Sequence, residues 1–270
     1  MGKNLMKIIL LAGPKQSGKT SAATAIYGYH LTSVGAIPNA TIDNNGKMSI
    51  IYKKETNEGI YFDIDDKSEN IVNWRNKFIN HHINHVGFAD ELKRVCVDLF
   101  DLDYAKITGT NEQKNEPSHI LWENMLNMFS GQLKKELKSI YPMTDARMTN
   151  REFMEVFGTF VCRYIWKDCH ISSAYKRLMK FDPEIGIIPD CRFDNEFEYF
   201  EKIPDVIKIK FKRNPYNSKA KSETGLDQIA DERFDLVIDN DNLSLADKNN
   251  LVINYLIKHG VLSKNNIKVD

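Results

Sequence analysis

The amino-acid sequence predicts an α/β fold with three layers: a central parallel sheet of about five strands between two layers of helices. Two observations support this prediction. Short apolar segments alternate with helix-like segments, and such alternation implies a parallel sheet that is covered on both faces. A glycine-rich phosphate-binding motif also follows the first apolar segment directly. The expected strands are residues 7–12, 84–89, 186–190, 206–211 and 234–239.

The phosphate-binding motif is Gly-Pro-Lys-Gln-Ser-Gly-Lys-Thr at residues 13–20, which fits the P-loop pattern G-x-x-x-x-G-K-T. Residues 21–27 continue from it as a helix. A glycine-rich turn directs several backbone N–H groups to one point, and the helix N-terminus adds partial positive charge. The motif predicts a nucleoside triphosphate site, in which Lys19 reaches the terminal phosphates and the Thr20 hydroxyl holds Mg²⁺. The expected ATP-binding residues are Gly13, Lys15, Ser17, Gly18, Lys19, Thr20 and Ser21.

Two inserted regions are expected between the strands. Asn45-Gly46, a type I′ turn signal, stands between strand-like flanks and is followed by a further apolar segment at residues 60–64. These features indicate an antiparallel β insertion at about residues 40–66. The middle of the chain is mostly helix-like, and we expect a helical substrate-binding region at about residues 101–181. With these insertions, the 270 residues are expected to form a single domain.

A helix is expected to begin at Thr149, because Thr149 and Glu152 have the spacing of a capping box. One face of this helix carries an apolar stripe. Another face carries a polar row at steps of four residues, which is open to two interpretations. It is a solvated face on which Glu155 bridges two arginines, as helix geometry alone favours, or it contacts the phosphate and base of a ligand. The stripe is Phe153, Val156, Phe157, Phe160, Val161 and Tyr164, and the row is Arg151, Glu155, Thr159 and Arg163.

Charged residues follow the third expected strand, at the edge where open parallel sheets bind ligands. Asp190 ends this strand, and Arg192 comes two residues later. In a P-loop protein, this placement favours a role for Asp190 in orienting the Mg²⁺ shell and a role for Arg192 in stabilising a transferring phosphoryl group. The alternative is that this segment is another helix N-cap, with Asp194 or Asn195 starting a helix.

Two further charged segments are less specific. Asp90, Lys93 and Arg94 follow the second expected strand, where a second phosphate-bearing substrate could lie, although Asp90 is equally suited to be an N-cap. Basic residues crowd the fourth strand and the loop after it. They predict either a loop that closes over a triphosphate and excludes water, or a solvated basic loop. These residues are Lys208, Lys210, Lys212, Arg213, Lys219 and Lys221.

Composition limits the function classes. The 37 basic residues balance the 37 acidic ones, so there is no support for a general nucleic-acid binder or a membrane-surface binder. The four cysteines form no C-x-x-C pair, which argues against a zinc site or a disulfide framework and suits a reducing cytosol. No apolar segment reaches transmembrane length.

Several short segments occur in an order that extends over nearly the whole chain, and in this order they resemble the phage-type deoxynucleoside monophosphate kinases, a branch of the P-loop nucleoside monophosphate kinases. Only the P-loop is specific by itself. The segments are residues 13–20; Phe88-Ala89-Asp90 with Lys93; residues 109–115 with Trp122-Glu123; Thr149, Arg151 and Glu152; Phe157-Gly158-Thr159 with Arg163; Asp190, Arg192, Phe193, Asn195 and Glu196; Arg213-Asn214-Pro215; Ser222-Glu223-Thr224; and Phe234-Asp235 with residues 237–240.

This resemblance implies a P-loop kinase that transfers the γ-phosphoryl group of ATP to a deoxynucleoside monophosphate (dNMP), with Mg²⁺ bound at Thr20 and Asp190. Arg192 is expected to bridge the two phosphates, and Arg213 resembles an arginine of a lid. With Lys19, these two arginines are the expected catalytic residues. The expected dNMP-binding residues are Lys93, Arg151, Gly158, Thr159, Arg163, His170, Asp190, Arg192 and Glu196.

The chain departs from the family pattern at two positions. The family often has Gln where this chain has Glu155, and often has an aromatic residue, usually Trp, near His170. An ionised carboxylate only accepts hydrogen bonds, whereas an amide also donates, so base preference stays open.

The expected partners are ATP and a dNMP, without stable nucleic-acid or membrane binding, and the expected location is the cytoplasm, that of the host if the chain is phage-encoded. A homodimer is left open. The alternative functions are a P-loop kinase for another small phosphorylated or hydroxylated acceptor, and a nucleotide-dependent switch or assembly protein.

Overall fold

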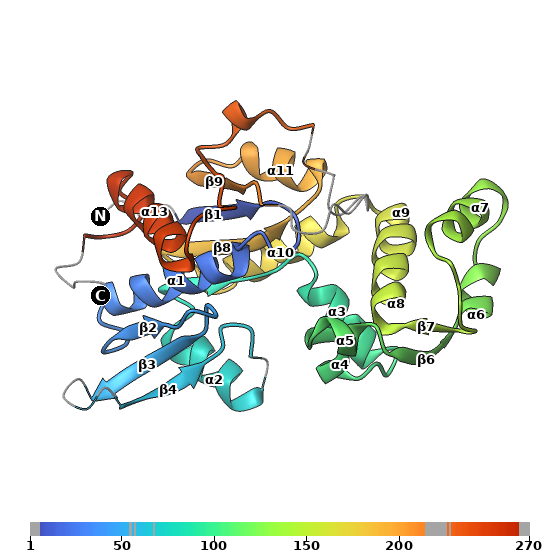
Figure 1. Ribbon diagram of the computed structural model, residues 1–270, viewed down its shortest axis with the longest axis horizontal. Coiled ribbons are helices and arrows are strands. Elements are labelled where there is room, and N and C mark those ends of the chain that lie inside the picture. Colours follow the sequence, from blue (N-terminus) through green and yellow to red (C-terminus); the bar gives the residue numbers. More distant parts are fainter. Residues whose placement is uncertain are drawn as a thin grey trace. The chain divides into compact units, whose positions relative to one another are not determined.

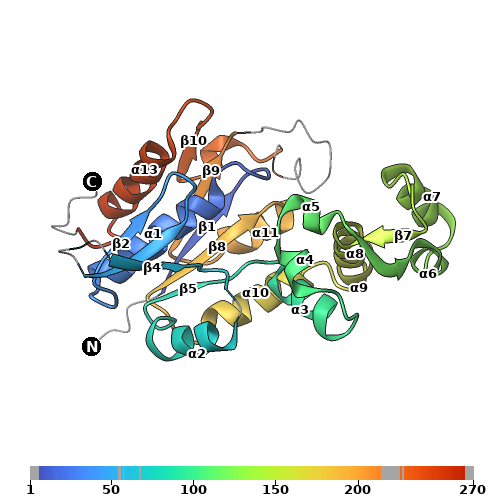
Figure 2. The same ribbon diagram turned by 60° about the horizontal axis from the view of Figure 1, so that its bottom comes forward.

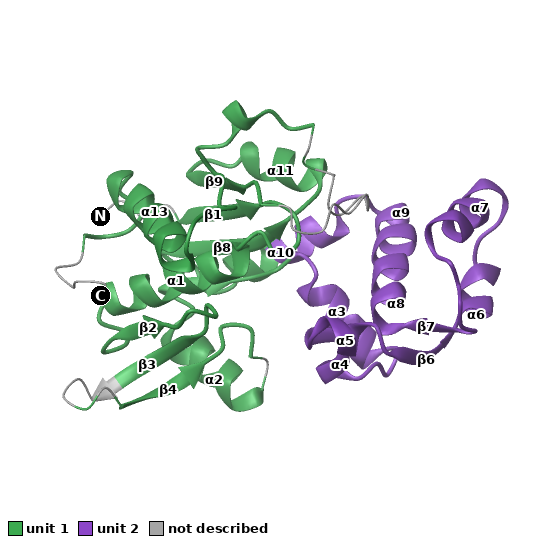
Figure 3. Cartoon of the chain, viewed as in Figure 1, with its two compact units in different colours: residues 1–87, 175–270 green, residues 88–174 purple. Residues whose placement is uncertain are grey.

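The computed structural model describes residues 6–53, 56, 58–66, 68–213, 226 and 228–264. The chain divides into two compact units (Figure 3). The first unit consists of Met1–Gly87 together with Tyr175–Asp270, and the second is Phe88–Ala174. The phosphate-binding motif therefore belongs to the first unit. None of the helices in the described ranges combines the length and the apolar character that crossing a membrane requires.

Five parallel strands form the sheet of the first unit, which confirms the predicted fold class (Figure 1). Their order is β10-β9-β1-β8-β5. β1 and β8 are almost completely buried and rich in Ile and Leu, as expected of strands that are covered on both faces. The strands are β1 (Lys7–Ala12), β5 (Ile83–His85), β8 (Ile185–Cys191), β9 (Val206–Phe211) and β10 (Leu236–Ile238).

The strand order places β1 at a topological switch point. The chain passes from β5 to β8 on one side of β1, and then crosses to β9 and β10 on the other side. In open parallel sheets, ligands bind outside the carboxyl ends of the strands at the point where the order reverses. The residues that follow β1, β8 and β9 therefore meet at the edge where such a ligand is expected.

Two of the expected strands are shorter in the structure. β5 ends at His85, although the Val86 N–H still donates to the Ile187 carbonyl at 3.0 Å. β10 begins at Leu236, because the preceding Asp235 does not continue the regular parallel ladder with β9. Its N–H donates to the Lys208 carbonyl at 2.9 Å, while its side chain accepts from the Lys208 N–H at 2.7 Å. This local pairing takes the place of a regular strand ladder.

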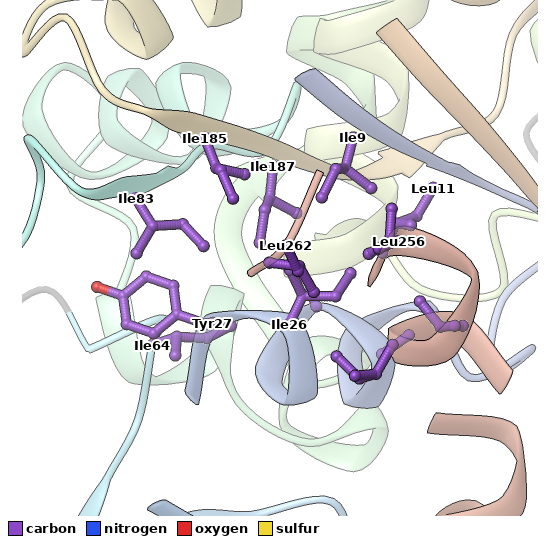
Figure 4. Packing of buried hydrophobic residues seen from close by; sticks show 14 of the residues in the cluster. Ile9, Leu11, Ile26, Tyr27, Ile64, Ile83, Ile185, Ile187, Leu256 and Leu262 are labelled. Atoms are coloured by element: carbon purple, nitrogen blue, oxygen red, sulfur yellow. The ribbon is translucent and has the colours of Figure 1, made fainter. Parts of the chain in front are cut away.

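Helices cover both faces of the sheet (Figure 2). On one face, α1 (Lys19–Ser33) and α13 (Leu245–Lys258) pack over the main hydrophobic core (Figure 4). On the other face lie α11 (Asp194–Glu201) and the part of α10 (Cys169–Met179) that begins at Tyr175. The main core includes Ile9 and Leu11 of β1, Ile26 and Tyr27 of α1, Ile83 of β5, Ile185 and Ile187 of β8, and Leu256 of α13.

The segment after α1 forms a three-stranded antiparallel sheet in the order β2-β3-β4, where the sequence indicates a β insertion. Gly46 in the connection between β2 and β3 has a φ of 78°, but the φ of Asn45 is not positive, and the Gly46 N–H donates to the Asp43 carbonyl at 2.9 Å. The turn is therefore residues 43–46 with the glycine in last place, and the type I′ turn expected at Asn45-Gly46 is wrong. Met48 and Phe62 from this sheet join the main core, so the insertion is packed into the first unit. The elements are β2 (Ala40–Ile42), β3 (Met48–Lys53), β4 (Glu58–Phe62) and the following α2 (Glu69–Phe78).

The second unit is mainly helical and has its own core, which includes Trp122, Leu137, Met148 and Phe153. A two-stranded antiparallel pair, β6 with β7, leads into its longest helical segment. That segment contains a π-helix, η1, between two α-helical parts. The elements are α3 (Asp90–Asp98), α4 (Tyr104–Thr108), α5 (Asn111–Lys114), β6 (Pro117–Leu121), α6 (Trp122–Asn127), α7 (Gly131–Ile140), β7 (Arg147–Thr149), α8 (Asn150–Val156), η1 (Phe157–Cys162) and α9 (Arg163–Ile165).

Candidate phosphate-binding site

The loop between β1 and α1 has the backbone conformation that its glycines permit. Gly13 and Gly18 have φ angles of 143° and 95°, a region that residues with a side chain rarely adopt, and Gln16 between them has a φ of 58°. Gly18 is the N-cap of α1, which is 15 residues long. The loop therefore ends at the positive end of a long helix dipole, where backbone N–H groups lack helical partners and anions bind.

Gly13 is also confined by its surroundings. A Cβ atom at this position would lie 2.5 Å from the backbone oxygen of Phe211, the last residue of β9. Glycine is therefore required here both by the φ angle and by the close approach of the neighbouring strand.

We expect Gly13→Ala to lower the free energy of unfolding by roughly 2–4 kcal/mol, because backbone strain and a backbone clash act together. Gly35→Ala is the matched control: Gly35 has a φ of 74°, but a Cβ there would meet nothing within 4 Å. It should lose only about 1 kcal/mol through conformation alone. Urea titration of the three proteins measures both values. Equal losses in the two variants would contradict the close packing of the loop against β9.

The Lys19 ammonium lies inside the loop. Its Nζ donates to the Gly13 carbonyl at 2.7 Å and to the Pro14 carbonyl, and lies 3.2 Å from Ser17 Oγ. The side chain is only 6% exposed, and Ser17 is fully buried. The charge is therefore held at the point around which the loop curves.

Two residues from the C-terminal part of the chain hold the same loop. Asn240 follows β10, and its Nδ2 donates to the Ser17 carbonyl at 3.0 Å. Lys248 of α13 donates from Nζ to the Gly18 carbonyl at 2.8 Å and to Ser21 Oγ. Burial, with the nearby Arg213 charge as a second cause, lowers the pKa of Lys248 to about 8.

Sequence reasoning missed Lys248, although a signal was present. Lys248 is spaced by four residues from Val252 and by eight from Leu256, so it stands on the stripe of α13 that faces the core. A lysine on such a stripe is almost never fully buried unless a partner requires it.

Asp190, Arg192 and Glu196 lie at the carboxyl end of β8, next to the loop. Asp190 is within β8 and half-buried, and the pairing of Ala12 with Cys191 puts it beside the end of β1. Glu196, only 1% exposed, accepts hydrogen bonds from the backbone N–H of Arg192 at 2.9 Å and of Phe193 at 3.1 Å. Its carboxylate thus fixes the backbone that carries Arg192.

The helix expected to start at Asp194 or Asn195 does begin at Asp194, as α11, but its N-cap residue is Phe193. Phe193 has no side-chain acceptor, so the Glu196 carboxylate serves the first turn in place of an N-cap side chain.

Arg213 is exposed just beyond the end of β9. Lys210 and Lys212, on the same strand end, both form ion pairs with Asp231 of the 3₁₀ helix η2 (Asp231–Arg233), Lys210 at 3.0 Å. The remaining part of the expected basic loop, with Lys219, Lys221 and the segments at residues 214–215 and 222–224, lies outside the described residues.

Six of the expected dNMP-binding residues belong to the second unit: Lys93, Arg151, Gly158, Thr159, Arg163 and His170. Thr149 caps α8 as predicted, with Glu152 completing the capping box. Arg151 then donates from Nε to Asn115 Oδ1 at 2.8 Å and from Nη2 to Asn111 Oδ1 at 2.9 Å. It thereby connects α8 to the segment around α5.

The expected helix face is interrupted by η1, which contains both Gly158 and Thr159. Steps of four residues share a face only in a continuous α-helix, so the row from Arg151 to Arg163 is not one regular α-helical face. The apolar stripe also fails toward its end, since Tyr164 is 78% exposed. π-Helical segments are rare in proteins overall, but those that occur often lie at functional sites.

Around η1, the backbone packs closely against other helices. A Cβ on Gly158 would lie 2.7 Å from Leu92 Cδ2 of α3, and His170 Nε2 lies 3.2 Å from the Gly158 carbonyl. His170 is buried in this arrangement. Lys93, the neighbour of Leu92, is half-buried on α3. The structure therefore brings the Gly158 backbone together with His170 and with the helix that carries Lys93.

Asp90 is the first residue of α3 and not its N-cap, which is Ala89. The N-cap interpretation of Asp90 is therefore wrong. An acidic side chain in the first turn still interacts favourably with the helix dipole.

Metal binding at Thr20 and Asp190 is compatible with the donor atoms present. Hydroxyl and carboxylate oxygens suit Mg²⁺, which usually takes one or two protein oxygens together with substrate phosphates and water. In the parts of the chain that the structure describes, no group of three or more His, Cys, Asp or Glu side chains could by itself hold a metal ion.

Comparison of the chain with protein-family models and with curated proteins finds no match.

Proposed function

We propose that this chain is an ATP-dependent deoxynucleoside monophosphate kinase, which transfers the γ-phosphoryl group of ATP to a dNMP and releases ADP and a deoxynucleoside diphosphate. One observation carries the proposal. The glycine-rich loop lies at the topological switch point of a parallel sheet and leads into the N-terminus of α1, with the Lys19 ammonium inside it. The choice of a dNMP as acceptor rests on the segments that resemble the phage-type kinases.

The donor end of the site would consist of the loop and the first turn of α1. The N–H groups at the start of α1 would bind the phosphates of ATP, and Lys19 would exchange its contacts with loop carbonyls for phosphate oxygens. Lys15, Ser17 and Ser21 complete this set. Mg²⁺, held by Thr20 and by Asp190 through water, would offset the negative charge of the phosphates.

Transfer itself requires alignment and charge stabilisation more than covalent chemistry. An ionised phosphate oxygen of the dNMP attacks the γ-phosphorus, and the bond from this phosphorus to the β–γ bridging oxygen breaks, so that ADP leaves. The acceptor oxygen is already deprotonated, so no strong general base is needed. Arg192, whose backbone is fixed by Glu196, would stabilise the charge on the phosphoryl group in transfer together with Arg213.

The acceptor would bind to the second unit through Lys93, Arg151, Gly158, Thr159, Arg163 and His170. Several features of this region are unusual for a purely structural helix: a π-helical turn, a buried histidine against a backbone carbonyl, and an arginine with two asparagine partners. A cytoplasmic location would suit this activity, since both nucleotides are available there.

The proposal is tested by measuring ADP release with each deoxynucleoside and ribonucleoside monophosphate in turn. ADP release that depends on a dNMP, together with formation of the diphosphate, would support it. ADP release with a different phosphorylated or hydroxylated acceptor would indicate another P-loop kinase. Slow hydrolysis that no acceptor accelerates would instead favour a nucleotide-dependent switch.

Arg151→Ala is expected to weaken dNMP binding by roughly 1.5–3 kcal/mol, the range for hydrogen bonds to a charged group. The acceptor KM for dGMP, dTMP, dCMP and dAMP measures this change. Arg147→Ala, which removes an exposed arginine of β7 in the same unit, is the matched control and should leave these values unchanged.

Asn115→Ala separates the two roles of Arg151. If Arg151 only connects α8 to the α5 segment, removal of its partner Asn115 should raise the acceptor KM as much as removal of Arg151. A wild-type KM in Arg151→Ala would contradict its place in the acceptor site.

A further inference from the structure

Two consecutive carbonyls of the phosphate-binding loop are held from outside by residues more than two hundred positions away in the chain. The Ser17 carbonyl accepts from Asn240 Nδ2 at 3.0 Å, and the Gly18 carbonyl accepts from Lys248 Nζ at 2.8 Å. Both donors are at least nine-tenths buried. The loop is thus attached to the segment after β10 and to α13 at the position where α1 begins.

We propose that Asn240 and Lys248 are positioning residues that direct the Gly18 and Lys19 amides toward the phosphates of the nucleotide. The proposal rests on the proposed ATP binding and adds two residues that the P-loop pattern does not contain. It follows from the geometry of the peptide bond.

In a trans peptide, the C=O and the N–H of the same unit point in opposite directions and are fixed in one plane. The Ser17 carbonyl shares a peptide unit with the Gly18 N–H, and the Gly18 carbonyl shares one with the Lys19 N–H. The Ser17 carbonyl is held by Asn240, and the Gly18 carbonyl by Lys248 together with the Ala22 N–H at 3.1 Å and the Ser21 hydroxyl at 3.0 Å, so the two N–H groups face away from these donors. They are then oriented before the ligand arrives, and such preorganisation strengthens anion binding.

The Lys248 contact is costly for folding, which argues against a merely structural role. Lys248 is 3% exposed, and its pKa falls to about 8, since burial disfavours the charged form. It also stands at the N-terminus of α1, where the helix dipole disfavours a cation. Arg213 adds positive charge nearby. The attraction of an anionic ligand for Lys248 would offset these unfavourable contributions.

The placement of Asn240 is also unfavourable for folding. Its Nδ2 is bonded to the Ser17 carbonyl, but its Oδ1 is buried without a hydrogen-bond partner within the described part of the chain. A buried acceptor without a partner costs stability. Within the described residues, the side chain of Asn240 is thus held at the loop through its donor alone.

Lys248 and Asn240 fill the space that a side chain at position 18 would occupy. A Cβ at Gly18 would lie 2.9 Å from Lys248 Nζ and 3.2 Å from Asn240 Nδ2. These three residues therefore pack directly against one another. Gly18, which has a φ of 95°, leaves space for the donor groups of both Asn240 and Lys248.

The test compares Lys248→Met and Asn240→Ala with wild-type protein and with two control variants. Lys258→Met and Asn254→Ala remove the same side-chain types from exposed positions of α13. Isothermal titration with Mg²⁺–ATP and with Mg²⁺–tripolyphosphate gives the Kd values, and thermal unfolding gives the Tm. Tripolyphosphate contacts only the phosphate site, so it reports on the loop and not on base recognition.

We expect Kd for both ligands to rise at least tenfold in Lys248→Met, with a Tm equal to or above that of wild type. Asn240→Ala should raise both Kd values in the same direction, and the controls should leave them unchanged. A folded variant with wild-type Kd values would overturn the positioning role. Weaker binding that is always accompanied by a proportionally lower Tm would also overturn it. If Lys248→Met does not fold, that role is wrong for Lys248, and Asn240→Ala then decides it for Asn240. Wild-type protein that does not bind Mg²⁺–ATP would instead contradict the proposed function.

Discussion

Lys19→Ala is expected to reduce kcat for phosphoryl transfer by a factor of roughly 10²–10³, the usual cost of one preorganised charge contact at a transition state. The Nζ atom lies inside the loop, where its bonds to the Gly13 and Pro14 carbonyls hold the charge near the expected phosphates. Because charge builds up on the transferring group, the loss should appear in kcat more than in the KM for ATP.

Two measurements complete this experiment. Circular dichroism and thermal unfolding should show that the variant keeps its fold, since Lys19 stands at the start of α1, outside the main hydrophobic cluster. Lys258→Ala, an exposed lysine of α13, is the control for removal of a positive charge. Near-normal turnover by a folded Lys19→Ala protein would contradict the assignment of the loop as the donor site.

The sheet could be predicted because its strands are defined locally. β1 and β9 have the predicted bounds, since each is a continuous apolar or alternating segment with a clear end. The phosphate-binding loop was predicted for the same reason: the motif requires certain residues at certain spacings, and the φ angles of Gly13 and Gly18 explain the glycines. The ends of β5 and β10 could not be predicted, because they depend on pairing with other strands.

The contacts that complete the site depend on residues distant in sequence. Asn240 is separated from Ser17 by 223 positions and Lys248 from Gly18 by 230, and no local pattern links them. Only the presence of a lysine on the apolar stripe of α13 gave an indication. Likewise, the aromatic and β-branched residues of 157–162 fit an α-helical stripe equally well, so the π-helix could not be predicted from spacing.

Glu196 shows how a site residue can have a structural contact that the sequence does not reveal. The resemblance implies a contact with the monophosphate, but the carboxylate accepts from the backbone N–H groups of Arg192 and Phe193 and is almost completely buried. Since a carboxylate has about four acceptor positions, this backbone contact and a ligand contact are not mutually exclusive. What the geometry does establish is that Glu196 controls the backbone from which Arg192 extends.

Arg192→Ala is expected to lower kcat by a factor of roughly 10²–10³, with a smaller increase in the acceptor KM. A group that lies between donor and acceptor acts mainly on the charge of the transition state, and so it affects kcat more than ground-state binding. Arg192 is suited to this role because it follows β8 at the switch-point edge and its backbone N–H is held by Glu196 at 2.9 Å. Steady-state kinetics with varied dNMP at saturating ATP gives both constants.

Two further variants make the test of Arg192 specific. Arg192→Lys keeps the charge but loses the planar fork of donors, so it should recover only part of kcat. Arg233→Ala removes an arginine of the same unit whose ion pair with Glu201 is solvent-exposed; such pairs contribute about 0–1 kcal/mol, so activity should not change. If Arg192→Ala changed only the acceptor KM, Arg192 would be a substrate anchor. The stabilisation of the transferring phosphoryl group would then have to come from Lys19 and Arg213.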